Sequence, residues 1–521
     1  MKNARKLLAL ALTLVMTLAL SVSALAAGSY TITIKNETAG HTYEAYQIFK
    51  GDLSSKDGSA VLSNIVWGSG VTEAGKTALR TFNGTTYDSA AALAAALTDT
   101  NVKDFAKAAA GYLATAADTS EWNASAKKYT ISGLEAGYYL VKDTSAPADD
   151  FYSAYIMEVV QNVDVTPKGN KPTLDKQVKG DSNWGKGTGK QIGDTVEFRT
   201  VSTVPGTEGY TSYTYIITDT MSEGLTSNVT SANDVTIKVN DSAVLDAAYY
   251  TVAATGNTFT VTIDIFKAIQ DGKMAAGNSL YTYYTGVLNE RAAIDGSLQS
   301  PQKNTASLTY SNDPNNTENK GKTPDVEVKV HTFEIKVNKV DKDNAPLTGA
   351  KFVLSKNGSL TLDALSCDEN GVPQNTSGLI GLVGTVENSY RVATPEDIAS
   401  NPDKIVYAME AGNIHIMGLD NAVDYYLYET KSPAGYNLLS APVHFTVNAT
   451  FDASGNCTVT GLTVDGSTVA DGIINVVNKA GSTLPSTGGI GTRIFYLLGG
   501  LLVVCAGVLL VTRKRMGKDE D

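Results

Sequence analysis

Cysteine and histidine are scarce in this chain of 521 residues, which has three cysteines and four histidines. Cys505 lies inside an apolar run, so a disulfide could form only between Cys367 and Cys457, and the sequence does not decide whether they pair. Disulfides are therefore not the main cross-links of this chain. The sequence has no HExxH motif and no nucleophile elbow, and it supports neither hydrolytic catalysis nor a metal or cofactor site.

Positive charge is also in short supply. The chain has 42 Lys and Arg residues against 54 Asp and Glu residues, which gives a formal net charge of -12 at pH 7. No basic cluster occurs between the two ends of the chain. A protein that binds nucleic acid needs such a cluster to neutralise phosphates, so we exclude nucleic acid as a partner. The acidic balance instead suits a soluble extracellular protein.

The beginning of the chain is typical of a secretory signal peptide. A basic start precedes an apolar run from Leu7 to about Leu20, and small residues follow. This order predicts a signal peptide over residues 1–26, with cleavage after Ala26. The alternative is a buried N-terminal helix, which the basic start and the small residues disfavour.

A second apolar run, from Ile494 to Val511, precedes a basic cluster at 513–515. The run is long enough to span a bilayer, and the cluster would keep its end in the cytoplasm. A permanent single-pass anchor is one interpretation. The pentapeptide before the run favours another, because it matches the LPxTG sorting signal of sortase substrates in every fixed position. These positions are Leu484, Pro485, Thr487 and Gly488.

The resemblance to sortase substrates implies a covalent link to the cell wall. A sortase cysteine would attack the carbonyl carbon of Thr487, release the chain from Gly488 onward, and hold the protein as a thioacyl intermediate. The apolar run would then be a temporary tether, and the mature protein would be extracellular and joined to peptidoglycan.

The part between the two ends has the pattern of an all-β protein. Short alternating runs, such as 31–34 and 257–263, are separated by Gly, Asn, Asp and Ser. This pattern predicts tandem immunoglobulin-like β-sandwich domains. Residues 88–118 are an exception, because they are rich in Ala and Leu and predict a helical insertion in the first domain.

The chain between the signals is long enough for three domains of ordinary size. Two prolines and a glycine at 165–172 predict the first join, and a second join is expected near 330–332. The predicted domains are 27–168, 169–331 and 332–480, and the sorting signal, membrane span and basic tail occupy 484–521.

Two strand-like segments have a lysine on their apolar face. Alternate residues of a strand share a face, so Lys176 is in phase with Leu174 and Val178, and Lys339 is in phase with Val337. Burying an ammonium group is costly without a partner. Both lysines should therefore meet partners that also face inward.

Acids and asparagines with the same inward phase follow each lysine. Asp219 and Asn304 share faces with apolar residues of the middle domain, as Glu429 and Asn478 do in the last domain. Asn475 is a rival of Asn478, because its neighbours in phase are also apolar. An ordinary buried salt bridge with a hydrogen-bonded asparagine would explain each set, and so would a sheet edge.

A family resemblance favours a third explanation. Residues 425–436 resemble the E-box of collagen-adhesin B-type domains, and 339–341 with 347–352 resemble the opening strands of those domains. Residues 217–226 and 303–306 resemble the middle domain of Gram-positive backbone pilins. Such domains form an intramolecular isopeptide bond between a lysine and an asparagine, promoted by an acid.

The resemblance implies two such bonds. The implied residues are Lys176, Asn304 and the acid Asp219 in the middle domain, and Lys339, Asn478 and the acid Glu429 in the C-terminal domain. Burial suits this chemistry, because desolvation lowers the pKa of an amine and raises that of a carboxylic acid, so a neutral amine can attack a polarised amide. In the first domain, Lys35 is out of phase with the apolar residues and Lys142 stands in the place of the acid. We expect no isopeptide bond there.

A further lysine, at the first domain join, has the opposite orientation. Val163, Val165 and Pro167 form the apolar set, so Lys168 should point to solvent. An exposed lysine is usually just a solubilising charge. However, residues 166–170 lie where backbone pilins carry a YPKN-like motif, although Thr stands for Tyr and a glycine precedes the Asn.

Residues 43–51 and 67–70 resemble the first domain of the same pilins. The chain thus resembles a Gram-positive sortase-assembled backbone pilin over nearly its whole mature length. The resemblance implies a structural subunit and not an enzyme: a pilus sortase would hold one subunit at Thr487, and Lys168 of another would attack. It also implies a housekeeping sortase, minor pilins, peptidoglycan and host surface molecules as partners. The alternative is a monomeric wall-anchored adhesin that binds a host protein or glycan.

Overall fold

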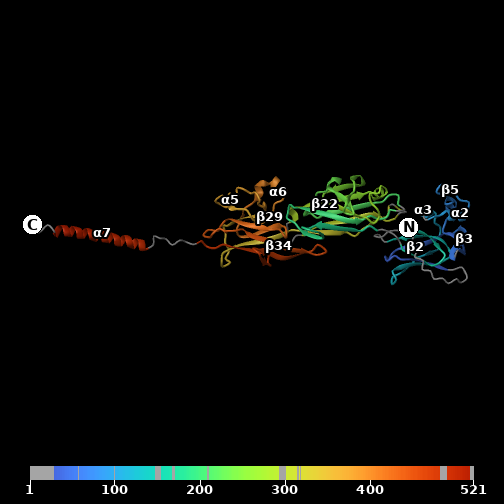
Figure 1. Ribbon diagram of the computed structural model, residues 1–521, viewed down its shortest axis with the longest axis horizontal. Helices are drawn as coiled ribbons and strands as arrows, with labels where there is room; N and C mark the ends of the chain where they lie inside the picture. The colour runs from blue at the N-terminus through green and yellow to red at the C-terminus, as the bar shows by residue number, and fades with distance from the viewer. Residues whose placement is uncertain are drawn as a thin grey trace, which may run out of the picture.

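The computed structural model describes residues 29–56, 58–98, 100–146, 154–166, 171–207, 210–292, 301–313, 316, 318–481 and 490–516. The predicted signal peptide, Lys168 and the LPxTG pentapeptide lie outside the described residues. Three β-rich segments follow one another along one long axis, and the C-terminal helix extends beyond them (Figure 1). The prediction of an all-β chain of tandem domains is confirmed.

In the first segment, two sheets enclose an apolar core. The strand order is β11-β1-β8-β7 in one sheet and β10-β9-β2-β3 in the other, with β6 paired to β2. Alternation places Ile32, Ile34 and Tyr129 inward. The strands are β1 Tyr30–Ile34, β2 Thr42–Lys56, β3 Ser59–Trp67, β4 Thr81–Phe82, β5 Thr85–Thr86, β6 Asp118–Thr119, β7 Glu121–Asn123, β8 Lys128–Leu134, β9 Gly137–Ser145, β10 Ala154–Val159 and β11 Val163–Val165.

The predicted helical insertion contains α2 (Ala90–Ala96) and α3 (Val102–Ala110). Ser89 caps α2 by accepting a hydrogen bond from the Ala92 N–H, and Phe105 of α3 stacks on Phe49 of β2 with ring centroids 5.7 Å apart. A third helix, α1 (Glu73–Ala78), was not predicted. It has only six residues and includes a glycine, so its helix propensity is weak, and a Thr72 cap starts it.

The middle segment is a larger sandwich of two sheets. Their orders are β13-β12-β15-β22-β18-β19, with β17 paired to β22, and β14-β25-β23-β16-β21-β20, with β24 paired to β23. Its elements are β12 Leu174–Lys179, β13 Trp184–Gly185, β14 Gly187–Gly189, β15 Thr195–Thr203, β16 Tyr215–Met221, β17 Leu225–Ser227, η1 Ala232–Asp234, β18 Thr236–Val239, β19 Ala243–Val244, η2 Ala247–Tyr249, β20 Tyr250–Thr255, β21 Thr258–Ile263, α4 Ile265–Gln270, β22 Ser279–Leu288, η3 Glu290–Ala292, β23 Gln302–Ser311, β24 Lys320–Lys322 and β25 Val326–His331.

The C-terminal segment is again a two-sheet sandwich, with orders β30-β28-β29-β32-β26-β37 and β31-β27-β33-β34-β35-β36. The first strand, β26, pairs in parallel with the last, β37. The elements are β26 Phe333–Val340, β27 Lys351–Ser355, α5 Leu362–Leu365, β28 Leu382–Gly384, β29 Ser389–Val392, α6 Pro395–Ser400, η4 Pro402–Lys404, β30 Ile405–Val406, β31 Met409–Glu410, β32 Asn413–Leu419, β33 Tyr425–Lys431, β34 Val443–Phe451, β35 Cys457–Val464, β36 Ser467–Val469 and β37 Ile473–Val477.

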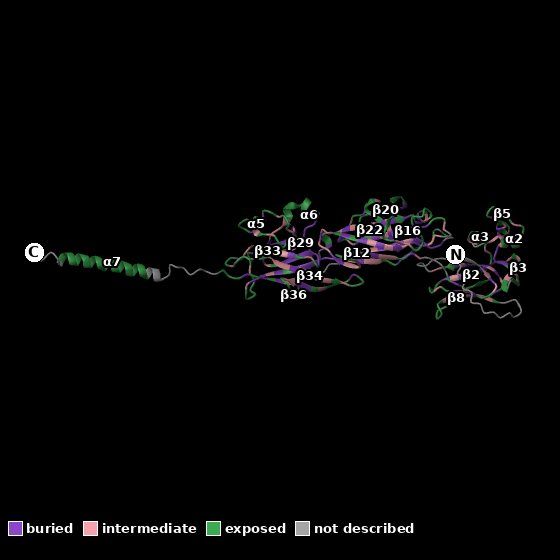
Figure 2. Cartoon of the chain, in the orientation of Figure 1, coloured by how far each residue is buried: buried purple, intermediate pink, exposed green. Residues whose placement is uncertain are grey.

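The junction between the middle and C-terminal segments is buried. Only Thr332 separates β25 from β26, and it is 2% exposed. The Ile192 N–H donates to the Gly418 carbonyl at 3.0 Å, and Nε2 of His331 lies 2.9 Å from the Gly455 carbonyl oxygen. One apolar core continues through both segments, and Figure 2 shows buried residues, in purple, along the strands of each. The two sandwiches are therefore packed against each other directly.

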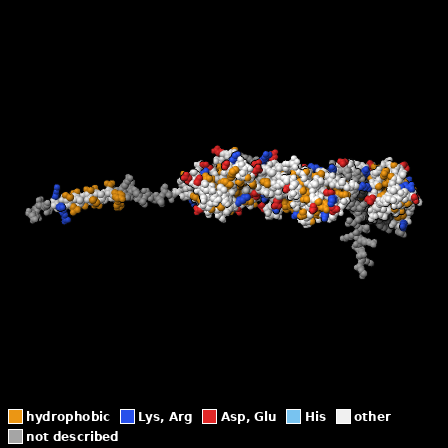
Figure 3. Space-filling view, turned by 90° about the horizontal axis from the view of Figure 1, so that it is seen from above, with side chains coloured by type: hydrophobic (Ala, Val, Ile, Leu, Met, Phe, Trp, Pro, Cys, Tyr) orange, Lys and Arg blue, Asp and Glu red, His pale blue; other side chains and the backbone are white. Residues whose placement is uncertain are grey.

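Helix α7 (Ile490–Met516) follows the last sandwich and includes a 22-residue stretch, Ile494–Arg515, that is long and apolar enough to cross a membrane. Apolar side chains cover this helix, and Lys and Arg gather near its end (Figure 3). Acidic and basic side chains are interspersed over the three β-rich segments on the same face (Figure 3). This distribution suits an extracellular body with a membrane tail.

Candidate functional site: two buried lysine clusters

Lys176 lies on β12 with its side chain between the two sheets of the middle sandwich. It pairs across the ladder with Thr200 of β15, and its own exposure is 0%. Lys176 and Lys339 are the buried lysines among the described residues. The alternation of β12 explains the placement, because Val178 points to the same core while Lys179 is exposed.

The partners of Lys176 come from the opposite sheet. Asp219 is on β16 and Asn304 on the adjacent strand β23, in a register that pairs Asp219 with Ala306 and Asn304 with Met221. Both side chains are 0% exposed. Nζ of Lys176 donates a hydrogen bond to Oδ2 of Asp219. The structure thus brings together the three residues that the sequence assigned to the middle domain.

Tyr284 of β22 joins this group, and the sequence analysis missed it. Its hydroxyl donates to Oδ2 of Asp219 and accepts hydrogen bonds from Nζ of Lys176 and from Nδ2 of Asn304, the last at 3.5 Å. We call these four residues the middle cluster. A tyrosine on the inner face of a strand usually belongs to an ordinary core, so its phase gave no signal. The available signal was that a buried tyrosine hydroxyl needs a polar partner.

Burial sets the charge state of the middle cluster. Desolvation lowers the pKa of Lys176, although the carboxyl of Asp219 opposes this shift. Desolvation also raises the pKa of Asp219, against the effects of Lys176, Tyr284 and Asn304. Both shifts favour the uncharged forms, so the cluster suits a neutral amine next to a protonated acid.

The C-terminal cluster consists of Lys339 on β26, Glu429 on β33 and Asn478 directly after β37, with exposures of 2%, 2% and 1%. Nδ2 of Asn478 donates to both carboxyl oxygens of Glu429, at 2.9 and 3.0 Å. Nζ of Lys339 donates to the Val476 carbonyl at 2.8 Å, and the Leu439 N–H donates to Glu429 at 2.9 Å. The parallel pairing of β26 with β37 brings the lysine next to the asparagine.

The same electrostatic pattern recurs in the C-terminal cluster. Burial lowers the pKa of Lys339, opposed by Glu429. Burial raises the pKa of Glu429, opposed first by the hydrogen bond from Asn478. The rival Asn475 lies outside the cluster: it is exposed, and its Oδ1 accepts a hydrogen bond from Nδ2 of Asn338 at 3.2 Å.

Both clusters leave an amide oxygen unsatisfied. Oδ1 of Asn304 and Oδ1 of Asn478 are buried without a hydrogen-bond partner among the described residues, as is Oδ1 of Asp219. Unpaired buried oxygens are uncommon in folded proteins and call for an explanation. An amide placed for attack at its carbon is one such explanation.

The first segment has a different buried pair. Lys35 is exposed and forms an ion pair with Asp164 at 2.9 Å, and Lys142 is only half-buried. The buried acid is Asp143, whose Oδ2 lies 2.7 Å from Nδ1 of His41. Burial raises the pKa of Asp143. No buried lysine stands beside this acid among residues 29–56, 58–98, 100–146 and 154–166.

The cysteines do not pair in this structure. Cys367, Cys457 and Cys505 are all free thiols. Burial raises the pKa of Cys457 to about 11, so this thiol is a poor nucleophile at neutral pH. No group of three or more His, Cys, Asp or Glu residues capable of holding a metal occurs in the described part of the chain.

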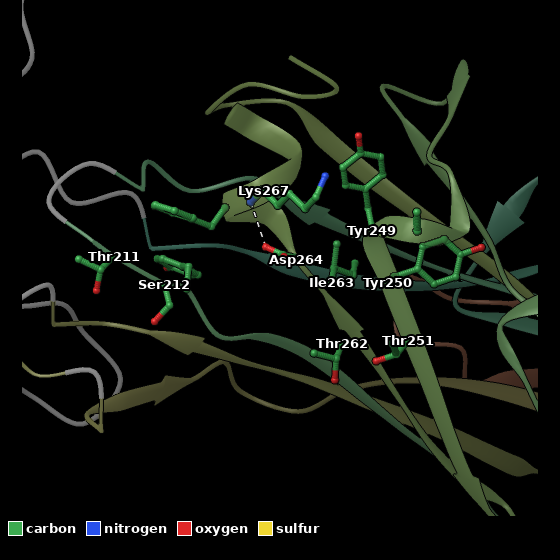
Figure 4. Close-up of a pocket in the computed structure, with 12 residues that line it drawn as sticks. Thr211, Ser212, Tyr249, Tyr250, Thr251, Thr262, Ile263, Asp264 and Lys267 are labelled. Carbon is green, nitrogen blue, oxygen red and sulfur yellow. Dashed lines mark hydrogen bonds between the residues drawn. The ribbon is translucent and has the colours of Figure 1, made fainter. Parts of the chain in front are cut away.

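An open hollow of about 520 Å³ lies in the middle segment between α4, the ends of β20 and β21, and residues 211–213 (Figure 4). The Lys267 N–H donates to Oδ1 of Asp264 at 2.9 Å, which caps α4. The Lys267 ammonium is paired with Asp271. The hollow has none of the residues of the two clusters in its lining, so we place no chemistry there.

Comparisons with known families identify two parts of the chain. Residues 333–460 match the SpaA prealbumin-like fold domain, which covers most of the C-terminal sandwich. Residues 476–516 match the LPXTG cell wall anchor motif, a range that includes the pentapeptide and all of α7.

A curated relative that matches about three quarters of the chain is a fimbrial subunit. The fimbrial subunit type 1 of Actinomyces viscosus is 25% identical over 429 residues, 74% of each chain. The T6 backbone pilin of serotype M6 Streptococcus pyogenes has 17% identity and a TM-score of 0.47, covering 89% of this chain and 100% of that one. The major pilin SpaD from Corynebacterium diphtheriae has 18% identity and a TM-score of 0.43, covering 88% and 99%.

The anchor motif behind a SpaA-type domain defines the class: this is a cell-wall-anchored surface protein of a Gram-positive bacterium. With the fimbrial relative, the findings support a narrower assignment to the sortase-assembled backbone pilins, which confirms the resemblance seen in the sequence. The chain is a structural subunit and a sortase substrate, not an enzyme.

Proposed function

We propose that this chain polymerises into a pilus by way of Thr487 and Lys168. A pilus sortase would hold one subunit as a thioacyl intermediate at Thr487, and the Lys168 amine of another subunit would attack that carbon. A housekeeping sortase would pass the finished fibre to peptidoglycan. Minor pilins and host surface molecules complete the expected partners. The domain limits 27–168, 169–331 and 332–480 are part of this proposal.

Each of the two later domains would be locked by an internal isopeptide bond. Nζ of Lys176 would attack Cγ of Asn304, and Nζ of Lys339 would attack Cγ of Asn478, with loss of one ammonia at each site. The observation that carries this proposal is the burial of a lysine, an acid and an asparagine together in two successive sandwiches. The shift of both amines and both acids toward uncharged forms supports the same chemistry.

Polymerisation is tested by comparing two lysine variants in cells that supply the pilus sortase. Lys168→Ala should abolish the high-mass ladder on SDS gels of wall extracts, while monomer remains wall-attached through Thr487. The matched control Lys176→Ala should keep the ladder, because its amine is 0% exposed and out of reach of a thioacyl enzyme. A ladder that survives Lys168→Ala would move the acceptor to another lysine, with Lys171 the nearest candidate. A wild-type protein without any ladder would instead favour a monomeric adhesin.

A further inference from the structure

The two clusters differ in how the acid reaches the asparagine. In the C-terminal cluster, Glu429 accepts both hydrogen bonds from Nδ2 of Asn478 directly. In the middle cluster, Nδ2 of Asn304 donates at 3.5 Å to the Tyr284 hydroxyl, which donates to Oδ2 of Asp219; the Asn304 side chain also lies close enough to Asp219 to lower the pKa of its carboxyl. Aspartate is one methylene shorter than glutamate. In the middle cluster the tyrosine hydroxyl contacts both the shorter acid and the asparagine.

The surrounding core fixes the position of this hydroxyl. Tyr284 is 3% exposed and stands directly opposite Phe198 in the β15–β22 ladder. Its ring stacks on Phe198 with centroids 5.8 Å apart and meets the edge of Phe259 at 4.9 Å. Burial raises its pKa well above 10, so the group is a neutral phenol that can donate and accept a proton. Few rotamers are open to a ring packed on two faces.

We propose that Tyr284 is a catalytic residue of the middle-domain isopeptide reaction and carries a proton from Asp219 to the leaving nitrogen of Asn304. This inference rests on the proposed function. It assigns to one hydroxyl the proton transfer that breaks the Cγ–Nδ2 bond, a role that no feature of the sequence indicated.

Each proton transfer follows a contact in the structure. Nζ of Lys176 forms a bond to Cγ of Asn304, and the Cγ–Nδ2 bond breaks. Attack makes Nδ2 tetrahedral and basic, and the two hydrogen bonds of Tyr284 then reverse their direction: protonated Asp219 passes its proton to the Tyr284 oxygen while the hydroxyl proton of Tyr284 moves to Nδ2, which leaves as ammonia. The carboxylate of Asp219 then takes the proton that Nζ sheds. Asp219 and Tyr284 return to their starting states, and the overall change is loss of one ammonia.

The C-terminal cluster provides an internal comparison. Among the described residues, the hydrogen bonds of Lys339, Glu429 and Asn478 involve a carboxyl and main-chain groups. Glu429 can therefore protonate Nδ2 of Asn478 without a relay. The length of the acid decides whether a tyrosine is needed, which makes the proposal testable by changing both residues.

The test measures isopeptide formation in the full chain. After pulse labelling, peptides that contain Lys176 and Asn304 are quantified by mass spectrometry in wild type, Tyr284→Phe and the control Tyr215→Phe. Tyr215 is also a buried tyrosine, 0% exposed, whose hydroxyl donates to the Thr203 carbonyl at 3.0 Å, away from the cluster. Tyr284→Phe should slow the Lys176–Asn304 bond on the order of a hundredfold, as expected for loss of a general acid.

Tyr215→Phe should form the Lys176–Asn304 bond at the wild-type rate, and the Lys339–Asn478 bond should form in all three proteins, which reports on folding. Adding Asp219→Glu to Tyr284→Phe should restore the reaction, because glutamate can reach Nδ2 of Asn304 directly. Formation at the wild-type rate in Tyr284→Phe overturns the proposal, and so does a double variant that stays unreactive. If the wild type lacks the bond, the proposed function fails instead.

Discussion

At the scale of residues, the two asparagines at the end of the C-terminal sandwich have opposite environments. Asn478 is buried against Glu429, whereas Asn475 is exposed on the other face of β37. Strand alternation alone could not separate them, because apolar residues flank both. The structure shows which face of β37 is the core: Ile474 and Val476 are buried, and Asn478 keeps their phase just beyond the strand, whereas Asn475 shares the outer face with the exposed Val477.

Each isopeptide bond makes the chain lighter than its sequence mass by one ammonia, about 17 Da. We predict that Asn478→Ala has a mass deficit smaller by one ammonia than wild type, whereas Asn475→Ala keeps the wild-type deficit. A cross-link that closes a loop of this length stabilises a fold by roughly 5 kcal/mol in the chain-entropy description. Asn478→Ala should therefore also lower the melting temperature of the C-terminal sandwich. Intact-mass spectrometry and calorimetry provide the two readings. If the mass deficit shrank in Asn475→Ala and not in Asn478→Ala, Asn475 would be the cross-linked residue.

Asp420 at the packed junction gives a pH-dependent prediction. It is 5% exposed, and burial raises its pKa to about 6, with Lys190 opposing the shift. Because this pKa lies above the unfolded value, the stabilising contribution of the protonated carboxyl is complete below the unfolded pKa and is lost as the pH rises through about 6. The cost at neutral pH is on the order of 3 kcal/mol.

Asp420→Asn should therefore raise the melting temperature at pH 7.5 by several degrees, because it removes a buried charge while an amide oxygen can still accept from the Asn421 N–H. The difference from wild type should shrink toward pH 4, where the native carboxyl is protonated. Thermal melts over this pH range measure it. A constant difference would show that Asp420 does not titrate at the junction.

The sequence predicted which side chains of the regular strands face the core. It did not predict their hydrogen-bond partners on the opposite sheet. The alternation around Lys176, Lys339, Asp219 and Glu429 predicted inward side chains, and the structure buries all four. Tyr284 escaped notice because a tyrosine among apolar residues fits any core. The His41–Asp143 pair joins residues 102 positions apart, and no local pattern indicates such a contact.

At the scale of elements, the proposed bonds would determine which strands carry force. A pull between Lys168 and Thr487 would enter at β12, pass from Lys176 to Asn304, and continue through β25 into β26. The second bond would carry it from Lys339 to Asn478. The strands within the two closed loops, such as β15 and β34, would then bear no load. The buried Thr332 junction lies on this path and transmits force between two packed sandwiches.

We predict that single-molecule pulling on the C-terminal and middle sandwiches extends neither loop in the wild-type chain. Asn304→Ala should release the loop that Lys176 closes, and this loop adds roughly 450 Å of contour length at about 3.5 Å per residue. Tyr215→Phe, which leaves the bond intact, is the control. Release of the same length in wild type would contradict the bond between Lys176 and Asn304.

The regular strands were the predictable elements, and the short helices and the junction were not. Alternation over β1 and β21 gave their positions directly, and the alanine-rich stretch gave α2 and α3. Helix α1 is too short to have a periodic pattern. The join near 330–332 was expected from turn residues before it, yet its side chains are buried because residues 190–192 and β32 hydrogen-bond around it. The burial of this join depends on contacts between residues far apart in the sequence, which no local pattern indicates.

At the scale of the whole molecule, the chain is a rod of sandwiches with an anchor at one end (Figure 1). A rod that is locked internally at two places and joined end to end gives a fibre that is covalent throughout. The proposed bonds would explain why a chain of this length, with three free cysteines, needs no disulfides.

The central claim is the covalent link between subunits, and the branched peptide at that link tests it most directly. Wall-extracted polymer is digested, and mass spectrometry seeks a peptide in which the Thr487 carboxyl is joined to a lysine side chain. The account predicts that this lysine is Lys168. Polymer in which Thr487 is joined only to peptidoglycan, with no lysine attached, would contradict the account.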